Sequence, residues 1–406
     1  MGREQTAEER TRPYAWVILL IVFLASFIAP MAQFKVTTLS EPLMAAFSLD
    51  AGSFGWLMSA LTVCGVILAI PAAWMCGKMG LKTTIMTSLA CVGVGSLVGA
   101  FADSTTVLYA SRAIEGCGIA LIGVSAPTAI SVWFPEKKRA LPLAIWCTWM
   151  PLGSTVAMLV VPQIANAFGW RGAWWMCVIA AAVVMVLVAV LFKMPENYTL
   201  EQSVEQEKGY FIKGLKFLKN KEIWLLCLAF FCFNFVCNGV FMNFYPMYLQ
   251  SGMGLTNAEA GAITSIMPIL TICIMPIMGV VYDKLGRRKP FVVAAFALCA
   301  CTLSIAFVGN IALVWASVLI FGTMGGLVAS GTRPMTPEIM EKNGQSALAV
   351  AMGMSVMQIS QNLAPTIGSP LFGSLAESAG WLTASLELCV PVAAIAVIAM
   401  ALIKVR

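Results

Sequence analysis

The stretch GVVYDKLGRRK, residues 279–289, sets one acidic and four basic residues between two long apolar runs. Glycine at Gly279 and Gly286 allows two helices to approach closely where they cross. Asp283 can pair with arginines or cap the start of a neighbouring helix. With Arg287 and Arg288 beside it, the stretch predicts a tight, charged turn between two helices.

The composition places these helices in lipid. Of the 406 residues, 60% are hydrophobic and only 11% are charged, and the mean hydropathy is +0.88. Soluble chains are about half apolar and a quarter charged, so a water-soluble fold could not hide this much apolar surface. Because a spanning helix needs about 20 apolar residues, the chain has room for roughly a dozen.

Apolar runs and polar breaks predict an all-α membrane protein with twelve transmembrane helices in two pseudo-symmetric six-helix bundles. We divide the chain into an N-terminal bundle (1–192), a polar cytoplasmic connector (193–221) and a C-terminal bundle (222–406). The predicted spans are 14–43, 53–76, 82–101, 106–133, 140–167 and 172–192, then 222–249, 258–281, 290–308, 311–336, 346–372 and 380–403.

The basic residues predict the orientation. With an even number of spans, both termini, the connector and every second loop share one side, and these segments hold all but four of the 25 Lys and Arg residues. Positive residues mark the cytoplasmic side, so we expect a multi-pass protein of the inner (cytoplasmic) membrane with both termini in the cytoplasm. The four exceptions are Lys35, Arg112, Arg171 and Arg333.

The two halves also show weak internal similarity. Pro42 and Pro246 occupy corresponding places, as do Pro127 and Pro334. Two related halves predict bundles that face each other, with a substrate site between them near the middle of the membrane. Chance matching of apolar sequence is the alternative.

Residues 279–289 resemble the signature loop of the major facilitator superfamily. The counterpart in the first half, residues 73–82, has Gly77 where an acidic residue is expected. The fourth span carries RAIEGCGIA, residues 112–120, which is similar to an arginine-and-glycine motif of the same family. The resemblance covers nearly the whole chain. It implies alternating access by rocking of two bundles, with Gly279, Asp283, Gly286, Arg287 and Arg288 as a gating loop.

Charges inside the predicted spans are functional candidates, because a charge at mid-bilayer costs roughly 3 kcal/mol. Lys35 is similar to a first-helix lysine of the monocarboxylate and organic anion branch, which implies an anchor for an anionic substrate. Its alternative is a snorkelling residue at the outer end of the helix. Arg333 is a second candidate anion contact, or part of an inner gate or loop pair, perhaps with Glu338.

Arg112 and Glu115 are three residues apart and can share one side of a helix. We consider them for proton coupling, with a local structural pair as the alternative. Inter-helix hydrogen bonding or core packing is the alternative for the remaining substrate-site candidates. These are Gln33, Trp149, Asn234, Asn238, Tyr245, Gln358, Gln361 and Asn362.

Several classes of function are disfavoured. The chain has no His, and its 13 Cys form no CxxC pair, so we expect no metal and no cofactor. No nucleophile–base set or phosphate-binding loop is present, which argues against an enzyme. The basic residues are scattered, so we expect no nucleic acid among the partners. The expected partners are a small-molecule anion, a coupling proton or counter-anion, and the lipid bilayer around a monomer.

We therefore predict a secondary active transporter of a small organic anion, in particular a carboxylate, by proton symport or anion exchange. The excess of buried cation over buried acid motivates this hypothesis. The alternative is efflux of lipophilic or cationic compounds, which a Met-rich apolar cavity would allow.

Overall fold

The computed structural model describes residues 13–68, 71–135, 138, 140–194, 220–341 and 347–404. Described elements in the first half are α2 (Tyr14–Phe34), η1 (Thr37–Leu39), α3 (Ser40–Phe47), α4 (Ala51–Ile67), α5 (Pro71–Met79), α6 (Leu81–Ala100), α7 (Thr105–Trp133), α8 (Ala140–Cys147), α9 (Trp149–Phe168) and α10 (Trp170–Leu191). Those in the second half are α13 (Lys221–Asn234), η4 (Phe235–Phe241), α14 (Met242–Ser251), α15 (Asn257–Leu285), α16 (Lys289–Leu303), α17 (Ile311–Glu341), α18 (Ala347–Ala379), α19 (Trp381–Ala384), η5 (Ser385–Cys389) and α20 (Val390–Leu402).

Every predicted span coincides with a helix or with consecutive helical pieces, which confirms the all-α prediction. Within the described ranges, nine helices are long and apolar enough to cross a membrane, and α4 and α16 are shorter apolar helices. The predicted connector falls mostly on residues 195–219, which lie outside the described residues. Its bounds, and those of the two domains, therefore stay predictions.

Local chemistry explains where the helices begin and end. Asp50 accepts a hydrogen bond from the Ser53 backbone N–H and so caps α4. Thr256 and Glu259 form a reciprocal capping box at the start of α15. Gly286 ends α15 in the left-handed region (φ 61°), which favours glycine because it has no Cβ.

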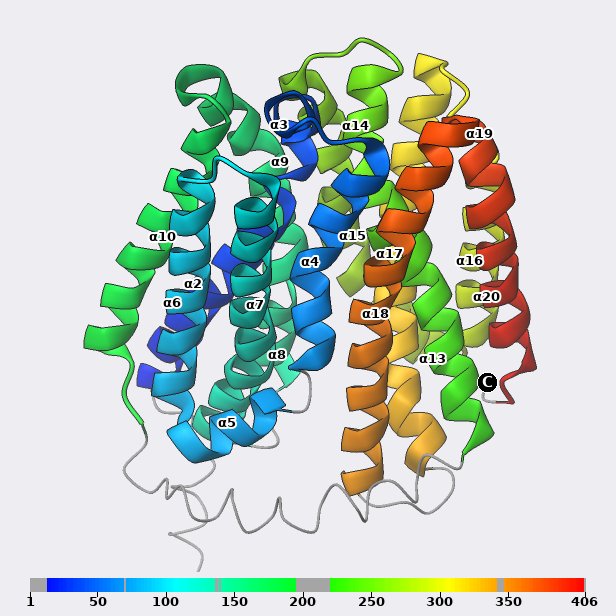
Figure 1. The fold of residues 1–406 in the computed structure, drawn as a ribbon. Coiled ribbons are helices and arrows are strands. Elements are labelled where there is room, and N and C mark those ends of the chain that lie inside the picture. Colours follow the sequence, from blue (N-terminus) through cyan, green and yellow to red (C-terminus); the bar gives the residue numbers. More distant parts are fainter. Residues whose placement is uncertain are drawn as a thin grey trace, which may run out of the picture.

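The helices form two bundles that stand side by side (Figure 1). In the first, α7 packs against α6, α4 and α2, and α10 covers α6. In the second, α15 packs against α17, and α20 packs against α13 and α16. We call the end where α10 and α20 finish and α13 begins the connector face. The opposite end, with α3, α14 and α19, is the far face.

The two bundles meet along α4 against α18 and along α9 against α15. The α4–α18 contact runs from the far face to the middle of the molecule, where Ser59 Oγ donates to the Thr366 carbonyl oxygen at 2.9 Å. At the far face, Ser40 Oγ donates to Gln250 Oε1 at 3.1 Å and links α3 to α14. This part of the contact holds no charged pair among the described side chains.

Nearer the connector face, the described pieces pack within their own bundle. α5 packs against α6 and α7, and α8 against α2, α7 and α9. In Figure 1 the lower ends of α8 and α18 stand apart. The conformation is therefore one in which the bundles are joined at the far face.

Close helix contact in the first bundle depends on Gly116 of α7. A Cβ at this position would lie 2.1 Å from the carbonyl oxygen of Leu61 in α4. Backbone atoms cannot move aside as a flexible side chain can, so any larger residue must push α7 and α4 apart. Glycine in the arginine-and-glycine motif is explained here by packing.

Replacing Gly116 by alanine should destabilise the protein by about 1–3 kcal/mol, the usual range for overpacking. Thermal unfolding of purified Gly116→Ala in detergent measures this. Gly123 on the same helix is a matched control, because a Cβ there would meet nothing within 4 Å. Gly123→Ala should unfold at the wild-type temperature or slightly above. Equal melting temperatures for the two variants would contradict the packing explanation.

Candidate functional site

Three charged side chains meet inside the first bundle. The Lys35 ammonium forms an ion pair with Glu115 Oε1, and Arg112 Nη1 donates to Glu115 Oε2 at 2.6 Å. Ser96 of α6 lies between them, donating to Glu115 Oε1 at 2.6 Å and accepting from Lys35 Nζ at 3.2 Å. The ring of Trp174 in α10 lies 4.5 Å from Lys35 Nζ. We call Lys35, Arg112 and Glu115 the charged cluster.

The cluster is fully buried and carries a net positive charge. All three side chains are 0% exposed, and two cations face one carboxylate. Arg112 also donates to the carbonyl oxygens of Ala32 at 2.6 Å and Gln33 at 3.0 Å. These carbonyls belong to the last turn of α2, where carbonyls lack partners within the helix. The guanidinium thereby fastens α7 to the end of α2.

The geometry decides between some of the alternatives for these residues. Lys35 does not snorkel to an outer surface, because its ammonium is enclosed and matched by Glu115. The predicted Arg112–Glu115 pair is present, with Lys35 as a third member. In this conformation Lys35 points toward α6 and α10, away from the second bundle. Its role as a substrate anchor stays a prediction, as does proton coupling by Glu115.

Arg333 of α17 lies at the level where the two bundles part. Its Nη2 donates to Gln361 Oε1 of α18 at 2.8 Å, and its side chain is half-buried. Cys147, at the end of α8 in the first bundle, lies within electrostatic reach of this guanidinium. The suggested pair of Arg333 with Glu338 is wrong, because Glu338 forms its ion pair with Arg288.

The polar residues of α18 gather near Arg333. Gln358 is exposed, and Gln361 and Asn362 are half-buried. Asn362 lies against α4 of the first bundle, since a Cβ on Gly65 would be 3.2 Å from its Nδ2. The predicted shared face of these amides therefore meets the boundary between the bundles.

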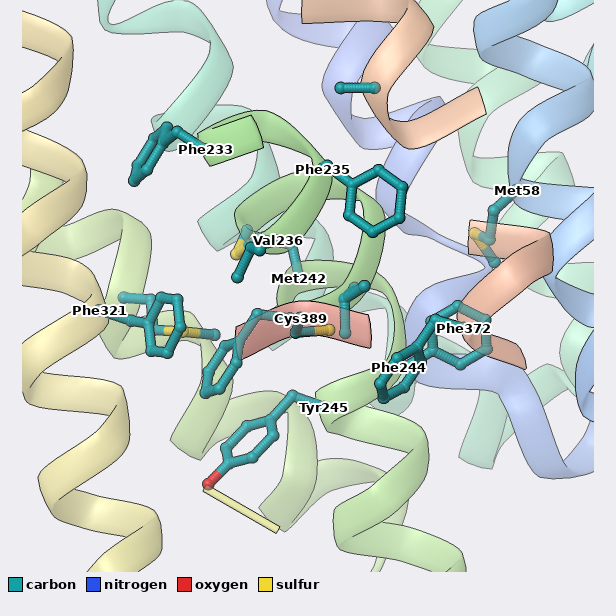
Figure 2. Close-up of a cluster of buried hydrophobic side chains, with 14 of the residues drawn as sticks. Met58, Phe233, Phe235, Val236, Met242, Phe244, Tyr245, Phe321, Phe372 and Cys389 are labelled. Carbon is teal, nitrogen blue, oxygen red and sulfur yellow. The ribbon is translucent and has the colours of Figure 1, made fainter. Parts of the chain in front are cut away.

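Other candidates have partners inside one bundle. Asn238 Nδ2 donates to Asn234 Oδ1 at 2.7 Å within η4 and the end of α13. The Tyr245 hydroxyl donates to the Ala306 carbonyl oxygen at 3.2 Å, and its ring lies in the aromatic cluster of Figure 2. Trp149 is buried and stacks on Trp146 at 5.6 Å. Gln33 is half-buried, with its carbonyl bound by the cluster.

The 279–289 loop keeps only part of its predicted geometry. Gly279 is not at a close crossing, since a Cβ there would meet nothing within 4 Å. The reason is that the connector-face ends of the bundles are apart. Arg287 is exposed, and Arg288 forms the ion pair with Glu338. The side chain of Asp283 lies outside the described part. A gating role for the loop stays a prediction.

Sequence reasoning missed two members of the cluster's surroundings, Ser96 and Trp174. Ser96 is a lone hydroxyl in an apolar span, which could have signalled a partner for a buried charge. Trp174 offers no such signal, because tryptophan is common near membrane surfaces. In the described ranges, no group of three or more Cys, Asp or Glu side chains is arranged to hold a metal ion.

Known proteins of two kinds are similar to this chain. The hexuronate transporter of Bacillus subtilis (strain 168) is 22% identical over 382 residues, covering 89% of this chain and 88% of the relative. The oxalate:formate antiporter of Oxalobacter formigenes is 24% identical over 381 residues, covering 91% and 87%. A bacterial homologue of the human lysosomal transporter Spinster has a TM-score of 0.77 at 16% identity, covering 97% of this chain and 96% of that one.

The structural likeness at this identity shows the fold alone, and it agrees with the two bundles described above. The family model of the Major Facilitator Superfamily matches residues 22–352, most of the chain. Relatives along nearly the full length are named as transporters. The chain therefore belongs to the Major Facilitator Superfamily and is a multi-pass membrane transporter rather than an enzyme.

Proposed function

We propose that this protein is a secondary active transporter of a small organic anion carrying a carboxylate, by proton symport or anion exchange. The observation that carries the proposal is the net positive charge of the buried cluster, where Lys35 and Arg112 share the single carboxylate of Glu115. The two relatives named above support it, since hexuronate, oxalate and formate are carboxylates.

Charge balance in the cluster links a proton to an anion. A proton on Glu115 alone would leave two unmatched buried cations, which is costly in a medium of low dielectric constant. An anion alone would compete with the Glu115 carboxylate for the same cations. Arrival of both keeps the net charge unchanged, because the proton neutralises Glu115 and the anion takes its place on Lys35. This is the physical basis for symport.

Arg333 supplies the first contact for the anion. It lies at the boundary between the bundles, and its only printed partner there is a neutral amide oxygen of Gln361. A carboxylate can replace that oxygen with a stronger, charge-assisted bond. Gln358 and Asn362 stand on the same helix to receive further polar groups of the cargo. With the orientation predicted from the basic residues, this contact is open toward the cytoplasm.

The alternative of cation efflux has weaker support. A cationic cargo needs an unmatched acid, and Glu115 is the buried acid among the described residues. It is already bound by two cations. Efflux of a neutral lipophilic compound would need neither Lys35 nor Arg333, so the variants below separate the two functions.

Changing the cluster should uncouple transport. In liposomes, we expect Glu115→Gln to retain exchange of a carboxylate, chosen from a thermal-shift panel of formate, oxalate, tartrate and glucuronate, but to lose its acceleration by an inward proton gradient. Lys35→Ala should reduce uptake at least about tenfold, because the remaining Arg112–Glu115 pair is neutral. Lys35→Arg should retain part of it.

The control for this experiment is Arg171→Ala, which removes an exposed ion pair with Asp103 at 2.8 Å. Exposed pairs contribute about 0–1 kcal/mol, so uptake should not change. Melting temperatures of all variants show that they fold. Carboxylate uptake that is unchanged in a folded Lys35→Ala protein would refute the role of Lys35.

Arg333→Gln should weaken carboxylate binding by about tenfold or more, since a hydrogen bond to a charged group contributes about 1.5–3 kcal/mol. Ligand-induced thermal stabilisation of the purified protein measures the change. Arg287→Gln is the matched control, because Arg287 is an exposed loop residue. If both variants bind the carboxylate as the wild type does, Arg333 is not the anion contact.

A further inference from the structure

A carboxylate of the second bundle caps a helix of the first. Glu377, in the last turns of α18, accepts a hydrogen bond from the backbone N–H of Ala51, with N and Oε2 2.5 Å apart. Ala51 is the first residue of α4. The two backbones touch here, since a Cβ on Gly373 would be 2.2 Å from the Ala51 carbonyl oxygen. This bond can exist only while the far face is closed.

The start of α4 favours the ionised form of Glu377. The first N–H groups of a helix lack partners within it, and the helix dipole places partial positive charge there. Asp50 satisfies one of these groups, the N–H of Ser53, at 2.6 Å. Glu377 satisfies another from across the interface. An ionised carboxylate accepts such a bond more strongly than a carboxylic acid does.

We propose that Glu377 is a proton-binding site that controls the opening of the far face. The closed state stabilises the ionised carboxylate, and the open state leaves it in water. The closed state therefore binds fewer protons than the open state, and lowering the pH shifts the population toward the open state. Glu377 is distinct from Glu115, which lies inside one bundle.

The surrounding groups leave this role to Glu377. The Ser53 backbone N–H lowers the pKa of Asp50, which therefore stays ionised in mildly acidic medium. The Tyr109 hydroxyl of α7 donates to the Ser53 carbonyl oxygen at 2.8 Å. Glu387 lies on η5, which packs against α18, and it is exposed. No described Lys or Arg lies within ion-pair distance of Glu377.

Charged groups elsewhere on α4, α18 and their neighbouring helices lie in other parts of the protein. Arg112 and Glu115 of α7 belong to the charged cluster. Arg333 and Glu338 of α17 have the partners described above nearer the connector face. Lys221 and Glu222 begin α13 at the connector face. The start of α4 is thus the described partner of the Glu377 charge.

Hydrogen exchange measured by mass spectrometry on the full-length protein in nanodiscs tests the proposal without any cargo. The reporters are peptides covering residues 48–58 and 370–379, compared at about pH 7.5 and about pH 4.5, which brackets the range of an ordinary glutamate. After correction for the intrinsic effect of pH, wild-type exchange should rise about three- to tenfold in acid, the range expected for loss of a helix cap.

Glu377→Gln should exchange at the raised rate at both pH values, because its amide is neutral and does not titrate. The matched control is Glu387→Gln, a neighbouring exposed carboxylate without the contact to α4, which should respond to pH as the wild type does. A wild-type pH response in Glu377→Gln would overturn the proposal. So would loss of the response in Asp50→Asn but not in Glu377→Gln, which would place the proton on Asp50.

Discussion

The structure depends on one carboxylate, Glu115, shared between two cations where water is absent. Removing one partner of a buried pair costs about 3–5 kcal/mol, because the other charge is left unmatched. The carboxylate of α7 thereby holds the end of α2 through Lys35 and, through Ser96, also binds α6. The first bundle is tied together at its centre and should move as one rigid body.

The contact between the bundles is built differently. It consists of hydroxyls, amides and glycines, such as the Ser59–Thr366 bond and the approach of Gly65 to Asn362. Hydrogen bonds between membrane helices average about 0.6 kcal/mol each, so this contact opens more readily than either bundle comes apart. Strong bonds within the bundles and weak ones between them are what rocking about a central site requires.

The spans followed from the sequence because apolar runs of membrane length admit one interpretation in lipid. The Arg112–Glu115 pair followed from helical spacing. What the sequence could not determine was direction and distance: which way the Lys35 side chain turns, and that Glu338 pairs with Arg288 rather than Arg333. The error at Gly279 arose because close packing depends on which face is closed, and one sequence must serve every conformation.

The second bundle serves as an internal control for the meaning of the charges. At the spacing that aligns Pro127 with Pro334, Arg112 and Glu115 correspond to Leu319 and Gly322. Beside these, Phe241 of η4 stacks on Phe321 of α17 at 3.8 Å, in an aromatic core (Figure 2). Apolar residues thus join the equivalent helices without any charge, and replacing buried ion pairs by apolar packing is often neutral or stabilising. The fold does not need the charged cluster, so its presence in one bundle is best explained by the cargo and the proton.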